Sequence, residues 1–159
     1  MEDLRCMVCF TCDDLTDFVE QGGSGYWKAS ADSISWANYL ICIKNKNGSN
    51  SKWKSDNDEH RQAFMIAKIN EQGYIDAGKR KVITFDEYAL LDDEIAPIIK
   101  WKGQSPIAYY TKEQLLQDSS GIDNFSNGVF DPSKLNWKSF SELKNEVEDK
   151  SPLKLSIKD

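Results

Sequence analysis

Hydrophobic positions along the chain gather into short strand-like runs separated by polar stretches. Runs rich in β-branched, aromatic and cysteine residues occupy Leu4 to Cys12, Asn38 to Lys44, Ala63 to Ile69 and Lys81 to Phe85. Turn residues over 70–79 join the last two runs into a probable hairpin. We therefore expect an α+β fold with a central, mainly antiparallel sheet, partial closure into a barrel being one form of it, and a few short flanking helices.

The helix signals are short and rest on capping residues. Asp13 predicts an N-cap for a helix over 14–20, which the following glycine-rich stretch ends as a C-cap and turn. Thr111 with Gln114 has capping-box spacing, and so has Ser139 with Glu142, whose helix is expected to run to about residue 150.

Three further segments are less regular. Residues 45–61 are almost wholly polar around a single tryptophan, which predicts a long loop that is either functional or mobile. Tyr88 to Leu91 predicts one helical turn. Leu153, Leu155 and Ile157 alternate with polar residues, so the C-terminal helix and tail over 139–159 are expected to end in an edge strand or a loose tail.

Length and composition indicate one domain over residues 1–159. The apolar runs are too short to cross a bilayer, which needs about 20 residues, and the first residues lack the pattern of a secretory signal. We therefore expect a cytoplasmic protein with no membrane partner, and we interpret its four cysteines as reduced thiols.

Charge is segregated along the chain. The formal net charge of −6 argues against a generally basic nucleic-acid coat. Between positions 44 and 81, however, nine cations oppose five anions, so this segment carries +4 and the remainder carries −10. The protein can therefore present an acidic face to a basic partner and still hold a basic loop.

The residues that could carry catalysis favour structural roles. A strand would place Cys6 and Cys12 on one face and Cys9 on the other, which disfavours a metal site. His60, the single histidine, is interpreted as a loop residue with carboxylate neighbours and no nearby nucleophile. Neighbouring acids such as Asp13 and Asp14 are typical of solvated surface. We expect no catalytic, cofactor or metal residues.

The polar loop leaves two interpretations open. Lys52, Trp53 and Lys54 could stack a base or anchor a partner protein, because tryptophan offers a flat face and lysine attracts phosphate or carboxylate. Alternatively the loop is mobile and its tryptophan folds back onto the domain.

Several stretches resemble a group of uncharacterised small bacterial and prophage proteins. The stretches are Gly25 to Lys28, Tyr39 to Asn45, Ala63 to Ile69, Phe85 to Ala89, Trp101 to Thr111 and Gly121 to Asp123. Their order is also similar, more distantly, to the PUA-like barrels of the EVE and ASCH type. The first resemblance implies that the protein is encoded by a mobile element. The second implies an aromatic-lined cup that recognises a modified base or another small group.

We expect a non-enzymatic binding protein, encoded by a phage or mobile element, that engages a host protein or nucleoprotein complex and inhibits a defence nuclease in the manner of an anti-CRISPR protein. Its carboxylates would imitate phosphate charge. The alternative is a PUA-like reader of nucleic acid or a modified base. The candidate contact residues are Tyr26, Trp27, Lys52, Trp53, Lys54, Asp92, Asp93, Glu94 and Trp101.

Overall fold

The computed structural model describes residues 3–120 and 128–149. Its strands are β1 (Arg5–Thr11), β2 (Ser24–Trp27), β3 (Tyr39–Lys44), β4 (Ala63–Ala77), β5 (Arg80–Leu90), β6 (Ile98–Ile99), β7 (Ile107–Thr111), β8 (Ser119–Ser120) and β9 (Lys138–Ser139). Its helices are α1 (Leu15–Gln21), α2 (Ala31–Trp36), α3 (Lys112–Asp118) and α4 (Phe140–Asp149), with a 3₁₀ turn at Pro132–Lys134.

The main sheet has the strand order β2-β5-β4-β3-β1-β7, and β9 also pairs with β5. Strands β1 and β3 are parallel, whereas the other neighbours in this order are antiparallel. The sheet curls into a half-barrel. The predicted α+β class, with a mainly antiparallel and partly closed sheet and short helices, is therefore confirmed.

Both faces of the sheet are buried. Along β1, Cys6 and Val8 enter one hydrophobic core, and Met7 and Cys9 enter the other, as the period of two requires. Every residue of β3 is buried, because its alternate side chains fill both cores. This explains why its sequence is nearly all apolar instead of alternating.

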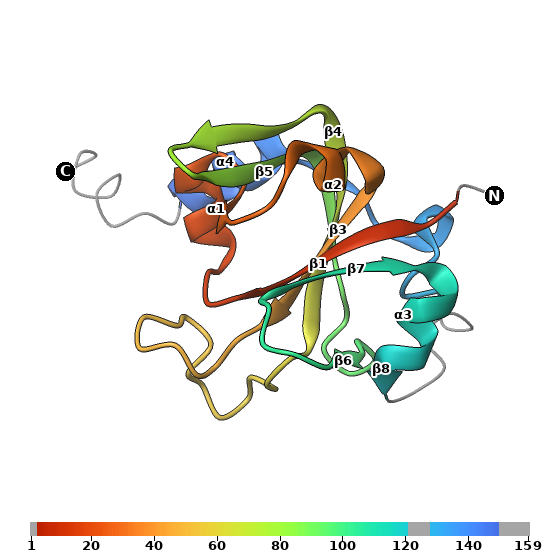
Figure 1. Ribbon diagram of the computed structural model, residues 1–159. Helices are drawn as coiled ribbons and strands as arrows, with labels where there is room; N and C mark the ends of the chain where they lie inside the picture. The colour runs from red at the N-terminus through yellow and green to blue at the C-terminus, as the bar shows by residue number, and fades with distance from the viewer. Residues whose placement is uncertain (1–2, 121–127, 150–159) are drawn as a thin grey trace.

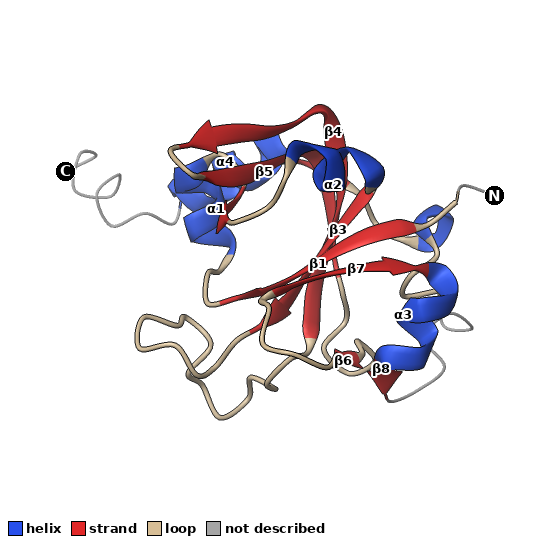
Figure 2. Cartoon of the chain, in the orientation of Figure 1, coloured by secondary structure: helices blue, strands red, loops and turns tan. Residues whose placement is uncertain are grey.

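The two ends of the sheet are surrounded by different kinds of secondary structure. In Figure 1, the outer part of the β4–β5 hairpin lies at the upper end of the sheet with α1, α2 and α4, and the loops over 45–62 and 91–106 lie together at its lower end. Figure 2 shows that this lower end is built mainly of loops, joined by the short strands β6 and β8. We call it the loop end. Strands β1 and β3 both run into it at their carboxyl ends.

Some sequence expectations need correction. Tyr88 to Leu91 does not form a helical turn, because β5 continues through Leu90 and pairs with β4 and β9. The N-cap of α1 is Asp14 and not the predicted Asp13, so the helix begins one residue later, at Leu15. Gly22 is the left-handed C-cap of α1, but Ser24 and Gly25 belong to β2 and not to a turn. The β4–β5 hairpin is longer than predicted, since β4 reaches Ala77. The predicted tail over 153–157 lies outside the described residues.

Candidate functional site

Three of the candidate contact residues, the aromatic residues Tyr26, Trp27 and Trp101, do not lie together. Tyr26 is 50% exposed on β2, while the neighbouring Trp27 is only 7% exposed and donates its Nε1 hydrogen to Ser24 Oγ at 3.0 Å. Trp101 lies half-buried at the loop end, where its indole nitrogen donates to the carbonyl of Ser105 at 2.9 Å. Trp27 therefore belongs to the core, and the other two rings lie on different elements.

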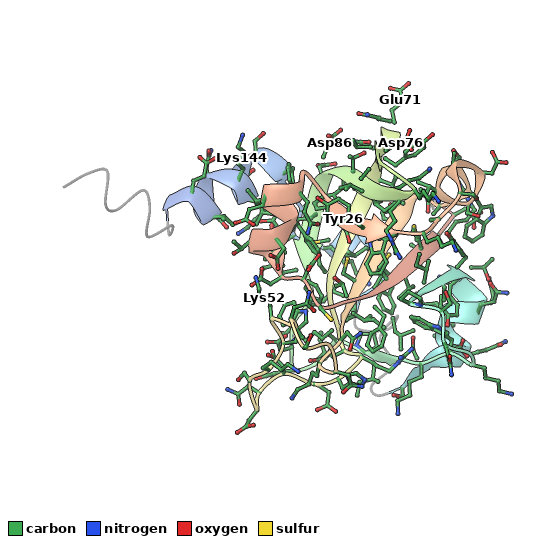
Figure 3. All side chains as sticks on the ribbon, turned by 60° about the vertical axis from the view of Figure 1, so that its left-hand side comes forward. Tyr26, Lys52, Glu71, Asp76, Asp86 and Lys144 are labelled. Carbon is green, nitrogen blue, oxygen red and sulfur yellow. The ribbon has the colours of Figure 1, made fainter. Side chains whose placement is uncertain are left out.

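The Lys52-Trp53-Lys54 segment turns back toward the protein. The Trp53 indole nitrogen donates to the carbonyl oxygen of Asp13 at 3.1 Å, and its ring packs on Phe64 with 4.5 Å between centroids. Lys52 forms an ion pair with Asp17 at 3.1 Å. Of the two interpretations of this loop, the geometry matches a tryptophan folded back onto the domain. Figure 3 shows Lys52 beside α1, and Tyr26 on a separate element.

Lys54 is also engaged within the loop. Its ammonium donates to the carbonyl oxygen of Lys46 at 2.7 Å. Lys46 in turn donates to two carbonyls of the same loop, those of Ser55 and Asp58. Two cations of the basic segment, Lys46 and Lys54, thus hold the loop together.

The acidic candidates, in contrast, lie beside a pocket of about 370 Å³ at the loop end. Asp93 and Glu94 line it together with Glu59 from the preceding loop, and Asp92 is exposed next to them. The described residues that line it are Asn57, Glu59, Gln62, Asp93, Glu94, Ile95, Ala96, Ile98 and Ser120. Among these described residues, three carry carboxylates and none is a lysine or arginine, so we call it the acidic pocket.

Local hydrogen bonds fix the wall of the acidic pocket. The Asp92 carboxylate accepts from the backbone N–H of Glu94 at 2.9 Å, and its carbonyl accepts from Ala96, so residues 92–96 form a closed turn. The buried amide of Gln62 donates to the carbonyls of Asp93 and Ala96 at 2.8 and 3.2 Å. These bonds attach the turn to the start of β4.

A buried lysine lies behind this wall. The Lys44 ammonium is 3.3 Å from Asp58 and 3.8 Å from Asp93, and it lies 5.2 Å from the centre of the Trp53 ring. The Asp93 side chain remains 77% exposed, whereas that of Asp58 is 17% exposed. The lysine therefore pairs most closely with Asp58 and leaves the pocket acidic.

Sequence reasoning missed a second feature of the loop end, an arginine held between two aromatic rings. The Arg61 guanidinium lies 4.3 Å from the centre of Phe10 and 4.4 Å from that of Trp101, and its Nε donates to the Ile99 carbonyl at 3.0 Å. Its Nη2 is buried and has no hydrogen-bond partner among the described residues. Arg61 also has a φ of 69°, which is rare for a residue other than glycine. No pattern in the sequence predicts this arrangement.

His60 has a structural place beside this arginine. Its ring packs edge-on against Phe10 at 5.1 Å, and its Nδ1 accepts from the Lys46 backbone N–H at 3.1 Å. Burial lowers the pKa of His60, and the positive charges of Arg61 and Lys46 lower it further. These cations outweigh the carboxylate neighbour Glu59, which acts in the opposite direction.

Three of the four cysteines belong to the hydrophobic cores. Cys6, Cys9 and Cys42 are buried, and burial raises the pKa of Cys6 and of Cys42 to about 12. A thiol must ionise to act as a nucleophile, so these two are unreactive near neutral pH. Within residues 3–120 and 128–149, no group of three or more His, Cys, Asp or Glu side chains could hold a metal ion.

Comparison of the chain with protein-family models, with curated proteins and with solved structures found no match. The resemblances to prophage proteins and to PUA-like barrels therefore stay predictions. Among the described helices, none has both the length and the apolar character needed to span a membrane.

Proposed function

We propose that this protein is a non-enzymatic binding protein that engages a basic surface of a partner protein through the acidic pocket. The supporting observation is that Glu59, Asp93 and Glu94 line one cavity although 34 positions of sequence separate the first from the second. A lysine or arginine side chain of the partner would enter it, because complementary charge steers and orients protein association.

The preorganised wall of the pocket supports this proposal. A binding surface that is already ordered loses less conformational freedom on association than a flexible loop does. The Asp92 turn and the Gln62 amide bonds fix the main chain that carries Asp93 and Glu94 before a partner arrives. The buried Lys44 ammonium also lies 3.8 Å from the Asp93 carboxylate.

The specific form of the proposal is an accessory protein of a phage or mobile element whose partner is a host nuclease complex. Nucleases bind their substrates through cationic channels, and a rigid array of carboxylates can occupy such a channel in place of phosphates. This form rests on the sequence resemblance and on the acidity of the pocket.

A charge-removal series tests the pocket. The triple variant Glu59→Gln, Asp93→Asn, Glu94→Gln removes three charges with little change of volume. A matched control, Glu71→Gln, Asp76→Asn, Asp86→Asn, removes three charges from the β4–β5 hairpin, where Figure 3 shows all three side chains together. Each variant is used as bait in host lysate, after circular dichroism has confirmed that it folds.

We expect the unmodified chain and the control to retain the same basic partner, and the pocket variant to bind it at least tenfold more weakly. Equal recovery by the pocket variant would refute the role of the pocket. If the partner is a nuclease complex, adding the chain should slow its cleavage of nucleic acid, and unchanged cleavage would exclude that form of the proposal.

A further inference from the structure

A second surface, separate from the acidic pocket, lies at the β7 edge of the sheet. Strand β7 ends the strand order and pairs only with β1 within the described sheet. It consists of Ile107, Ala108, Tyr109, Tyr110 and Thr111, without a charged residue or proline. Protein sheets usually protect such an edge with lysine, proline or a bulge, because its free main-chain groups can pair with another strand.

The register shows which main-chain groups of β7 face outward. The carbonyl of Arg5 accepts from Asn38, toward β3, whereas the N–H of Phe10 donates to Pro106, toward β7. The even-numbered residues of β1 therefore bond to β7, and their partners there are Tyr110 and Ala108. The main-chain groups of Ile107, Tyr109 and Thr111 must then point away from the sheet.

Two side chains cover the ends of this edge. The Ser105 hydroxyl bonds to both the N–H and the carbonyl of Ile107, and the Gln114 side chain accepts from the N–H of Thr111. Between them, the N–H and carbonyl of Tyr109 have no hydrogen-bond partner in the described part of the chain. One residue of an added strand can therefore make two main-chain hydrogen bonds here.

A groove of about 360 Å³ adjoins the same residue. It is lined by Asp32, Ser33, Trp36, Tyr109 and Gln114. The Trp36 side chain is 38% exposed and lies edge-on to Tyr109, with 6.3 Å between the ring centres. Because side chains of directly paired strand residues lie on the same face, a residue paired with Tyr109 would place its side chain in this groove.

The charge of the groove indicates which kind of peptide residue would bind there. The Asp32 carboxylate is exposed and forms no ion pair with any described residue, so a cation two positions along the added strand would reach it on the same face.

A second copy of the chain is a poor occupant of the β7 edge. Each chain carries a net charge of −6, and the covered edge leaves one residue of β7 free to pair. A stable dimer buries roughly 1,200–2,000 Å².

We propose that β7 and this groove bind an extended peptide segment of a partner protein. One residue of the segment pairs with the main chain of Tyr109 and places a large apolar side chain beside Trp36. A lysine or arginine two positions away faces Asp32. Strand addition at a sheet edge draws affinity from main-chain bonds and specificity from such side-chain pockets.

The probe is the acetylated and amidated peptide Lys-Thr-Trp-Thr-Lys, titrated into the full ¹⁵N-labelled chain and followed by NMR. We expect shifts at the Tyr109 amide and at the Trp36 indole N–H, and slower hydrogen exchange at Tyr109. Three matched peptides separate the contributions: one with alanine at the centre, one with glutamates for the lysines, and one N-methylated at the central amide. Each should bind at least tenfold more weakly.

Variants of the protein complete the test. Trp36→Ala should weaken binding at least tenfold, whereas Leu90→Ala, at an exposed leucine on β5, should not change it. Absence of shifts at Tyr109 and Trp36, or equal binding of the N-methylated peptide, would overturn the proposal. Protection of the Tyr109 amide that rises with protein concentration alone would also overturn it, because the occupant would then be a second copy.

Discussion

At the scale of single residues, the loop end depends on polar and charged side chains that are held inside the fold. Lys44 is buried against Asp58, and Arg61 is enclosed by Phe10 and Trp101. A buried charge is costly unless it is compensated, so these side chains constrain the loops that surround them. The order of the loop end therefore follows from a few specific contacts.

His60 gives the loop end a dependence on pH. Its folded-state pKa is lowered, mainly by burial and then by nearby cations, below the usual 6.5. The unfolded chain consequently binds a proton at this residue at a higher pH than the folded chain does. The stability that the neutral ring provides is complete above pH 6.5 and is lost as the pH falls through the lower folded value.

The variant His60→Asn tests this dependence, because an asparagine oxygen can accept from the Lys46 N–H but does not titrate. Urea unfolding at several pH values should show the unmodified chain losing more stability than the variant between pH 6.5 and 5. Titrating carboxylates affect both proteins alike. Parallel losses in the two would show that His60 does not control this range.

Contacts of this kind also limit what sequence can predict about single residues. The polarity of residues 45–61 indicated a loop, but the tryptophan within it packs on Phe64 and bonds to Asp13, 40 positions away. The acids Asp93 and Glu94 were identified as contact residues, yet their neighbour Glu59 was not. Its place follows from how two loops meet at the loop end, which a linear pattern does not contain.

At the scale of elements, predictions succeeded where local hydrogen bonds decide the structure. The Thr111 and Ser139 capping boxes both form and start α3 and α4. The segment Tyr88 to Leu91 failed because its local pattern permits a helical turn, whereas pairing with β4 and β9 makes it a strand. Tertiary pairing overrode local preference there.

The cap of α1 provides a quantitative test at this scale. The Asp14 carboxylate accepts from the Asp17 N–H at 3.2 Å, and the Asp17 carboxylate accepts from the Asp14 N–H at 3.0 Å. Asp14→Ala should lower the free energy of unfolding by about 1 kcal/mol, because an N-cap acceptor is lost. Asp14→Ser retains an acceptor and serves as the control in denaturant titrations. Equal stability of both variants would contradict the role of the cap.

At the scale of the whole molecule, a sheet buried on both faces separates the two surfaces proposed to bind partners. The acidic pocket lies at the loop end, and the groove lies between α2, β7 and α3. Two partners, or two parts of one partner, could therefore be bound without competing for the same residues.

Hydrogen exchange should map this organisation directly. Amides of β1 and β3 should exchange slowest, because each strand is paired on both sides and buried on both faces. In the free protein the Tyr109 amide should exchange much faster than that of Tyr110, its neighbour in β7, which faces β1. Equal protection of the two amides would show that the edge is covered.

The parallel pairing of β1 with β3 has a consequence for synthesis of the chain. Although β1 precedes the other described strands in the chain, its two neighbours are β3 and β7, and β7 ends at Thr111. The pairing of β1 on both sides cannot be completed until synthesis has passed Thr111. Non-local pairing of this kind slows folding, and the nascent chain must keep β1 from pairing elsewhere until then.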